Sequence, residues 1–531
     1  MNAPLLRRTL IVACLALSVA GCASPRATAG TIEVVIKVDG ELHDLAVPAG
    51  STVQQALVQA GVVLGESDRV APPVYTVLSR GSEVLVTRVE ERFEVEQVVL
   101  PFERQIIRNE ALPSGESRLL QAGHNGTQEV TYRIVLEQGA EVGRNPVKSV
   151  VTQEPVPEIV MVGAQISFTP VEIQGTLAYL SGGNAWVMRQ DSRDRRPVVV
   201  SGDLDGRIFQ LSPDGRWLLF SRRPAQETAG EINSLWIVST SEEQADPISL
   251  RARNVVHFAD WSPVGGPNYA IAYSTVEPSP GSPGWQANND LLLVPVTAAG
   301  RVLKEEILIP TNAGGQYGWW GTTYAWAPDG NRLAYARADS IGTIDVQEPA
   351  LAPILSIVPY QSFSDWAWVP GLAWAGDSQT VYFVRHGAPL GLESEASSPV
   401  FDMLALSEAG PEPLVMAERC GMFASPSLSP AVAQPGGELG ARLAFLQSLA
   451  PLESQTSSYQ IVSMDRDGSN RTTLFPATGE AGLTPHPLVW SPDGDRLAFA
   501  YRGDLWIVDA RSGQAQRLTG DAQTEAYDWA N

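Results

Sequence analysis

The segment VWSPDGDRLAFAY, residues 489–501, decides the fold because similar segments occur elsewhere in the same chain. QLSPDGRWLLFSRR starts at Gln210, and YAWAPDGNRLAYARAD starts at Tyr324. In each of them Pro presets φ for a turn, Asp bonds the local backbone, and Gly allows the conformation that closes a hairpin. The residues after each turn are apolar on both faces, as in a strand packed between two sheets. The segment is therefore a repeated building unit and not a single site.

The repeat continues through the last two thirds of the chain. An aromatic residue or leucine precedes each turn at intervals of 39 to 65 residues, a period that suits four strands plus variable loops. These positions are Leu211, Trp261, Trp326, Trp374, Leu428, Trp490 and Trp529. The repeats resemble those of TolB-type β-propellers, which implies a mainly β protein with a propeller over residues 175–531. The seven signals predict seven blades; because the insertions are long, six or eight blades are the alternatives.

The two ends of this repeat region are complementary. The last inner-strand signal, TEAYDWAN, has no further strand after it. The segment GTLAYLSGGNAWVMRQ from Gly175 contains strands of a blade but lacks the innermost strand that should precede them. We therefore expect the last strand to join the first blade and close the ring, which removes both open edges.

The chain begins with MNAPLLRRTLIVACLALSVAGCAS. Two arginines precede an apolar run that is too short to span a bilayer comfortably, and small residues lead into Cys22. This resembles the bacterial lipobox, which implies a signal peptide over residues 1–21, lipid attachment at Cys22 and a linker over 22–30. An ordinary signal peptide with an incidental cysteine is the alternative. We expect an exported protein, anchored by lipid to a bacterial membrane and facing the periplasm or the cell exterior.

Residues 31–90 form a separate small pattern. Asp39-Gly40 separates two strand-like runs, which predicts a hairpin, and Ser51 and Gln54 are spaced as a capping box before a helix that Gly61 ends. Strands are predicted around residues 74–78 and 83–89. This ββαββ order resembles the ubiquitin-like module found in resuscitation-promoting factors, which implies a small α+β domain.

Residues 91–164 alternate polar and apolar residues with little continuous apolar content, which predicts long strands in a thin, elongated sheet. The segment resembles the bacterial five-glycine (G-five) domain, and a linker follows over residues 165–174. That resemblance implies binding of peptidoglycan or other N-acetylglucosamine polymers, or a spacer. We expect the glycines to serve positive φ or close strand approach. The resemblance rests on Leu100-Pro101-Phe102, Gly123, Gly126, Gly139 and Gly163.

The composition excludes several classes of protein. A chain of 531 residues needs two or more domains, and a formal charge of −22 repels anionic polymers, so no nucleic-acid partner is expected. Only three cysteines occur, so no disulfide framework is expected. Cys420 is predicted to be a buried apolar residue.

No catalytic or metal-binding motif stands out, so neither a catalytic residue, a cofactor nor a metal is expected. Gly376-Asp377-Ser378 resembles an esterase motif, but it aligns with the hairpin turn of the repeat. MDRDGSN at Met464 resembles the start of a calcium loop, but its glycine comes early and residue 476 is Pro, so a turn is predicted. The histidines are spread singly over the chain, as His43, His124, His257, His386 and His486.

One feature lies outside the repeat. Long connections that open on one face of the ring carry many aromatic residues, and indoles stack on sugar rings and peptide side chains. We predict that they form a ligand-binding rim around one mouth of the channel; packing beneath their own loops is the alternative. The rim comprises Trp285, Tyr317, Trp319, Trp320, Trp366 and Trp368.

These features predict a non-catalytic lipoprotein of the cell envelope. Its stalk would bind peptidoglycan, and its propeller would bind a protein or glycan partner. The alternative is an envelope glycan hydrolase or lyase with a carboxylate pair in the channel, roughly 5–10 Å apart. A channel lined by backbone and small residues would favour binding.

Overall fold

The computed structural model describes residues 30–110, 112–164, 168–225, 230–265, 268–407, 410, 412–433 and 439–531. The predicted signal peptide and Cys22 lie outside these residues. Two compact units are present: one holds residues up to 105 together with 121–158, and the other holds 106–120 together with 159–531. No helix of the described part is long and apolar enough to cross a membrane.

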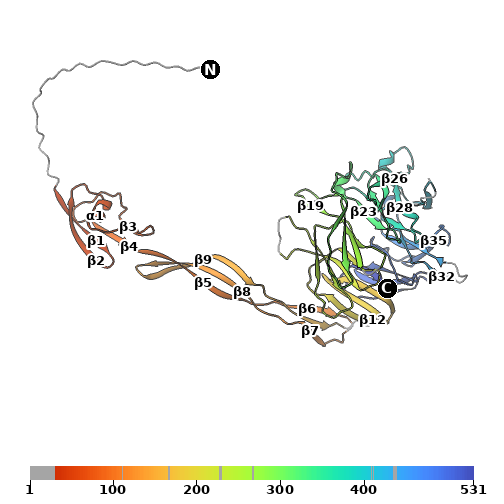
Figure 1. The fold of residues 1–531 in the computed structure, drawn as a ribbon, viewed down its shortest axis with the longest axis horizontal. Coiled ribbons are helices and arrows are strands. Elements are labelled where there is room, and N and C mark those ends of the chain that lie inside the picture. Colours follow the sequence, from red (N-terminus) through yellow and green to blue (C-terminus); the bar gives the residue numbers. More distant parts are fainter. Residues whose placement is uncertain are drawn as a thin grey trace, which may run out of the picture. The chain divides into compact units, whose positions relative to one another are not determined.

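The first unit starts with the predicted ββαββ domain (Figure 1). Its sheet has the order β2-β1-β4-β3, and Val34, Ile36 and Leu57 lie in its core. Asp39 and Gly40 have φ of 53° and 82°, which confirms the predicted hairpin turn. The elements are β1 (Thr31–Val38), β2 (Glu41–Pro48), α1 (Val53–Gln59), β3 (Arg69–Ala71) and β4 (Glu83–Thr87).

Two details of this domain differ from the prediction. The helix is capped one residue later, because the Thr52 side chain accepts a hydrogen bond from Gln55 N and Gln55 Oε1 accepts one from Thr52 N. The Ser51 hydroxyl instead donates a hydrogen bond to the carbonyl oxygen of Pro48 at 2.8 Å. The third strand is β3 and not residues 74–78, where the backbone caps the helix: Val53 N donates to Thr76 O.

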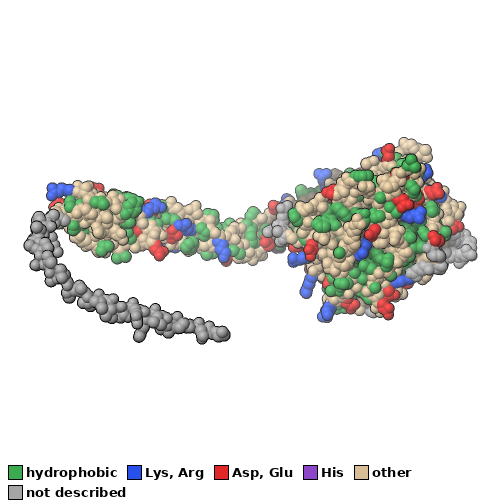
Figure 2. All heavy atoms as spheres, turned by 90° about the horizontal axis from the view of Figure 1, so that it is seen from above, with side chains coloured by type: hydrophobic (Ala, Val, Ile, Leu, Met, Phe, Trp, Pro, Cys, Tyr) green, Lys and Arg blue, Asp and Glu red, His purple; other side chains and the backbone are tan. Residues whose placement is uncertain are grey.

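The thin sheet is confirmed and consists of β5 (Val89–Leu100), β8 (Gly126–Glu137) and β9 (Ala140–Gln153). Only Val130 and Ile134 of its hydrophobic side chains are buried, and Figure 2 shows many hydrophobic side chains reaching the surface. Arg144 covers part of one face, with its guanidinium 4.7 Å from the Tyr132 ring centroid. The long side chain of Arg144 thus covers apolar surface of the sheet in place of a second layer of strands or helices.

The G-five glycines mark close approaches of chain segments. A Cβ at Gly123 would lie 2.3 Å from the Phe102 ring, and one at Gly163 would lie 1.9 Å from Pro113 O. The predicted structural role of these glycines is confirmed. A second sheet of the order β6-β10-β7 follows, built from β6 (Arg104–Asn109), β10 (Glu158–Gly163) and β7 (Ser117–Gln121).

The second unit contains seven propeller blades among the described residues (Figure 1). Blade 1 consists of β41 (Thr524–Ala530), β11 (Glu172–Ser181) and β12 (Asn184–Val199). Blade 2 consists of β13 (Leu204–Leu211), β14 (Trp217–Arg222), β15 (Ser234–Ser239) and β16 (Ile248–Arg253). Blade 3 consists of β17 (Ala259–Trp261), β18 (Asn268–Tyr273), β21 (Leu291–Thr297) and β22 (Glu306–Ile309).

The other four blades have four strands each. Blade 4 consists of β23 (Thr323–Trp326), β24 (Arg332–Arg337), β25 (Ser340–Asp345) and β26 (Ala352–Ser356). Blade 5 consists of β27 (Leu372–Trp374), β28 (Thr380–His386), β29 (Phe401–Ser407) and β30 (Leu414–Ala417). Blade 6 consists of β31 (Ser427–Leu428), β34 (Arg442–Ser448), β35 (Tyr459–Asp465) and β36 (Thr472–Phe475). Blade 7 consists of β37 (Val489–Trp490), β38 (Arg496–Tyr501), β39 (Asp504–Asp509) and β40 (Ala515–Arg517).

The ring closes as predicted. β41 pairs antiparallel with β11, and Trp529 lies opposite Leu177. The first blade therefore combines two segments from opposite ends of the repeat region.

The repeated tryptophans link neighbouring blades. The indole of Trp261 donates to Gln210 O at 3.1 Å, that of Trp374 to Ala325 O at 3.0 Å, and that of Trp490 to Ser427 O at 3.1 Å. In each pair the acceptor belongs to the innermost strand of the preceding blade. The tryptophan at the end of an inner strand is thus a structural residue of the ring.

Two isolated side chains have the structural roles predicted for them. Ser378 lies in the hairpin turn with φ of 55°, where the repeat otherwise has glycine, and its hydroxyl accepts a hydrogen bond from Asp329 N. Cys420 is fully buried, and burial raises the pKa of its thiol to about 12.

Candidate functional site

A cavity of about 390 Å³ opens in the second unit where the inner strands of blades 4 to 7 begin. Neutral side chains and backbone line it, together with three prolines that stiffen the segments before the strands. The only ionisable group of the lining is the phenol of Tyr324, which donates to Asp290 O. The lining residues are Thr323, Tyr324, Val369, Pro370, Gly371, Leu372, Ser425, Pro426, Ser427, Pro487 and Leu488.

The aromatic connections emerge at this same end of the blades. Trp285 lies in a hairpin of β19 (Val276–Pro278) and β20 (Trp285–Ala287), and Trp319 and Trp320 lie in the short helix η1 (Gly318–Trp320). These two elements pack against each other. Tyr317 precedes η1 and is partly buried, whereas Trp319 is 38% exposed.

His257 lies between these two connections. Its ring meets Trp285 edge-on at 4.5 Å between centroids, and a Cβ at Gly321 would lie 2.6 Å from His257 Nε2. Burial lowers the pKa of His257 to about 4, so the imidazole is neutral at physiological pH. The histidine is therefore an uncharged packing element under the aromatic loops.

Asn289 holds the η1 loop in place. Its side-chain amide donates to Gly318 O at 2.8 Å, and its carbonyl oxygen accepts from the Thr322 hydroxyl at 2.9 Å. The residue is 1% exposed and has φ of 50°, a backbone region that Asn tolerates better than most residues. Trp319 and Trp320 are thus presented from a braced loop.

The remaining two predicted rim residues, Trp366 and Trp368, have different environments in the structure. The loop of Trp366 lies near the hairpin of Trp285, since the Ser282 side chain lowers the pKa of the Asp365 carboxylate. Trp368 is only 3% exposed, donates its indole N–H to Met422 O at 3.0 Å and packs on Phe401. Trp368 cannot stack on a ligand, so its prediction as a binding residue is wrong, and the alternative of packing beneath its own loop holds there.

Two carboxylates interact on the inner strands of blades 1 and 3. Asp528 on β41 accepts hydrogen bonds from Leu211 N and Trp529 N, and Asp260 on β17 accepts one from Trp261 N. Burial and the charge of Asp528 raise the pKa of Asp260 to about 7, and burial raises that of Asp528 to about 6. Part of this pair is protonated near neutral pH.

A sequence signal for these two acids exists but was missed. Both precede the aromatic residue that ends an inner strand, where the other blades have Gln210, Ala325, Ala373, Ser427 and Val489. No group of three or more His, Cys, Asp or Glu that could hold a metal occurs in the described part of the chain.

Comparisons with known proteins identify the two modules that precede the propeller in the sequence. Residues 91–165 match the G5 domain, and residues 34–74 match the G5-linked ubiquitin-like domain. The chain is 28% identical over 174 residues to the resuscitation-promoting factor RpfB of Mycolicibacterium smegmatis. That match covers 32% of this chain and 47% of RpfB, so the chain spans about half the length of that relative.

Solved structures are similar to parts of the chain. The G5 domain of IgA1 protease is 28% identical, with 15% of this chain and 94% of that one covered and a TM-score of 0.12. A prolyl endopeptidase is 12% identical, with 66% and 49% covered and a TM-score of 0.42. The oligogalacturonate lyase of Vibrio parahaemolyticus is 11% identical, with 71% and 97% covered and a TM-score of 0.35.

Proposed function

We propose that this chain, with a G5 domain, a G5-linked ubiquitin-like domain and a seven-bladed propeller, is a non-catalytic binding protein of the bacterial cell envelope. Lipid at Cys22 anchors it to a membrane, on the side of the periplasm or cell exterior. The propeller, of the TolB type, binds a glycan or protein partner through the mouth of its channel and the aromatic residues beside it. The ubiquitin-like and G5 modules form a stalk that contacts peptidoglycan, as the resemblance to the G-five domain implies.

The neutral lining of the 390 Å³ cavity where the inner strands of blades 4 to 7 begin, here called the mouth cavity, carries this proposal. Hydrolysis of a glycan needs an acid and a second carboxylate at the scissile bond, and the lining of this cavity has neither. Concave sites with aromatic neighbours and a few polar groups are typical of binding. The exposed indole of Trp319, on a loop braced by Asn289, adds a flat surface for a sugar ring or an apolar side chain.

The test uses the purified protein and purified peptidoglycan sacculi in a sedimentation assay. The double variant Trp319→Ala, Trp320→Ala is compared with Ile307→Ala, which removes an exposed apolar residue from outer strand β22. We expect the double variant to lose most of the propeller's contribution to binding, whereas Ile307→Ala binds normally. A folded double variant that sediments like the unaltered protein would contradict the rim as the glycan site.

The second candidate function is glycan cleavage by Asp260 and Asp528. The raised pKa of both groups favours it, because a general acid must hold its proton near neutral pH. Release of reducing ends from sacculi that disappears in both Asp260→Asn and Asp528→Asn would support this candidate. Sacculi that stay intact in the presence of the unaltered protein would leave binding alone.

A further inference from the structure

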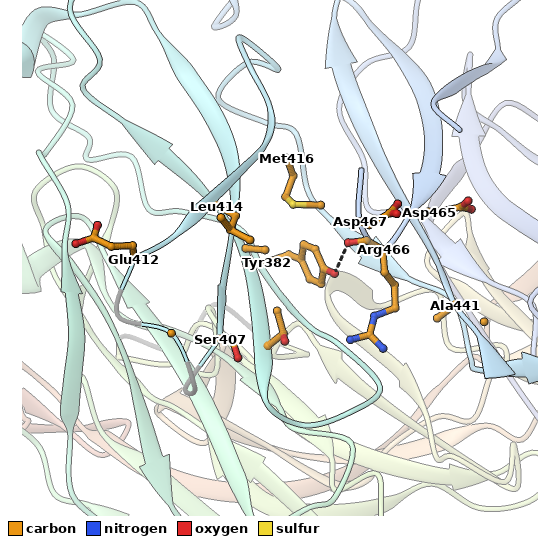
Figure 3. Close-up of a pocket in the computed structure, with 13 residues that line it drawn as sticks. Tyr382, Ser407, Glu412, Leu414, Met416, Ala441, Asp465, Arg466 and Asp467 are labelled. Carbon is orange, nitrogen blue, oxygen red and sulfur yellow. Dashed lines mark hydrogen bonds between the residues drawn. The ribbon is translucent and has the colours of Figure 1, made fainter. Parts of the chain in front are cut away.

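A second, larger cavity lies at the opposite end of the blades from the channel mouth. It has a volume of about 930 Å³ and lies between blade 5 and blade 6 (Figure 3). Its walls come from the start of β28, the end of β29, strand β30 and the turn after β35. Its lining residues are Thr380, Tyr382, Ala405, Ser407, Gly410, Glu412, Leu414, Met416, Gly440, Ala441, Asp465, Arg466 and Asp467.

The middle of this groove is apolar. Leu414 and Met416 project into it from β30, whereas Val415 between them belongs to the other face of the strand and is absent from the lining. Leu414 is 69% exposed, so its side chain is available for an apolar contact. Tyr382 forms part of the floor, and its hydroxyl is occupied by Arg466 O at 3.1 Å.

Carboxylates stand at both ends of this apolar stretch. Figure 3 shows Glu412 at one end and Asp465 and Asp467 at the other, with Leu414, Met416 and Tyr382 between them. The one cation of the lining, Arg466, forms an ion pair with Asp377. Glu412 forms no hydrogen bond or ion pair within the described residues. The groove therefore offers negative charge on either side of an apolar surface.

The backbone of β30 adds a third feature. β30 is the outermost strand of blade 5 and, among the residues that the structure describes, pairs with β29 only, so its other edge offers N–H and C=O groups there. An extended peptide can add to such an edge and place alternate side chains on one face of the sheet.

We propose that this groove binds an extended, positively charged peptide segment of a partner protein. Its apolar side chains lie against Leu414 and Met416, and its Lys or Arg side chains face Glu412 and the Asp465–Asp467 turn. The charge of the whole protein, formally −22, favours approach of such a segment. This site is separate from the channel mouth, so neither site depends on the other.

The test is a fluorescence-anisotropy titration of the purified protein with a labelled Lys-Ser-Leu-Ser-Val-Ser-Lys peptide, which places both Lys and both apolar side chains on one face when extended, at low ionic strength. We expect saturable binding that salt weakens. Leu414→Ser removes the apolar contact and weakens binding by about tenfold. Glu412→Gln removes one exposed charge and weakens it by about threefold.

Two neighbouring substitutions are matched controls. Val415→Ser changes an exposed residue on the other face of the same strand, and Glu418→Gln changes an exposed acid just beyond its end. Both should bind within about twofold of the unaltered protein, given the usual scatter for surface positions. A peptide with Glu in place of Lys should not bind.

Three results would overturn the proposal. The first is an absence of saturable binding by the unaltered protein. The second is equal binding of the Lys and Glu peptides, or equal losses in the groove and control variants. The third is self-association in sedimentation that Leu414→Ser abolishes, which would assign the groove to a second copy of the chain.

Discussion

Glu110 Oε2 lies 2.5 Å from Arg195 Nη1, and the two side chains are only 7% and 6% exposed. Glu110 follows the end of β6 in the G5 domain, and Arg195 lies on β12 in the first blade. The carboxylate also accepts from Gly520 N at 2.8 Å, just before β41. Within the second compact unit, Glu110 of the G5 domain is thus joined to the first blade through Arg195 and to the loop before β41 through Gly520 N.

Arg195→Ala is expected to destabilise this unit by about 3–5 kcal/mol, because it leaves a buried carboxylate without its cation. Burial already raises the pKa of Glu110 although Arg195 opposes the rise, and without Arg195 the pKa rises further. A raised carboxyl pKa costs stability above that pKa, so the loss should be smaller at pH 5 than at pH 8. Urea unfolding at both pH values measures it. Arg193→Ala, which breaks an exposed pair with Asp191, should cost less than about 1 kcal/mol.

Asp260→Asn is expected to stabilise the protein at pH 8 by on the order of 1–2 kcal/mol. The folded pKa of Asp260, about 7, exceeds the ordinary value of 3.8, so folding favours the protonated form. The cost of the ionised form grows as the pH rises through that pKa and is absent below about pH 4. The gain should therefore vanish at low pH. Thermal melts across pH 4–8 measure it, with Glu525→Gln on β41, the strand of Asp528, as a neutral control. A gain that is equal at all pH values would contradict the pKa shift.

Trp368→Ala and Trp319→Ala should separate stability from binding. Trp368 is buried and hydrogen-bonded, so its truncation should cost about 3–5 kcal/mol. Trp319 is partly exposed and should cost less than about 1 kcal/mol. Equilibrium unfolding of the two variants provides the comparison. Equal losses would mean that Trp319 also is a packing residue and would weaken its assignment to the rim.

Trp529→Phe tests the hydrogen bond that the indole of β41 donates to β11, the strand with which it closes the ring. The Trp529 indole donates to Gln174 O at 2.7 Å, so Phe should cost about 1–2 kcal/mol through the unpaired carbonyl and the smaller ring. Trp529→Ala should cost about 3–5 kcal/mol because the side chain is also buried. Chemical denaturation gives both values, and an unchanged midpoint for Trp529→Phe would show that the hydrogen bond adds nothing.

The sequence predicted the ring well because each blade repeats the same local chemistry. The aromatic residue, turn and apolar strand around Trp490 satisfy local and global requirements at once. The capping box was misplaced by one residue because Ser51 and Thr52 can both cap a helix, and only the contact of Ser51 with Pro48 distinguishes them.

The candidate sites were harder to predict, because side chains distant in sequence form them. Trp368 and Trp366 are two residues apart and look alike in the sequence, yet only Trp368 meets Met422 O and enters the core. The groove of Leu414 combines two blades, and no pattern within one repeat indicates which gaps between blades stay open. The interaction of Asp260 with Asp528 likewise depends on the ring bringing β17 and β41 to either side of β13.

The pairing of β41 with β11 also governs the order of assembly. Trp529 and its acceptor Gln174 are 355 residues apart, whereas the hairpins within a blade are local. Contacts of such long sequence separation form slowly, because the loop between them must close first. During synthesis β11 is made early and its partner β41 last, so Leu177 and Tyr179 remain without their final cover while the other blades are produced. The open arc is therefore the aggregation-prone species, and the first blade is the last one to be completed.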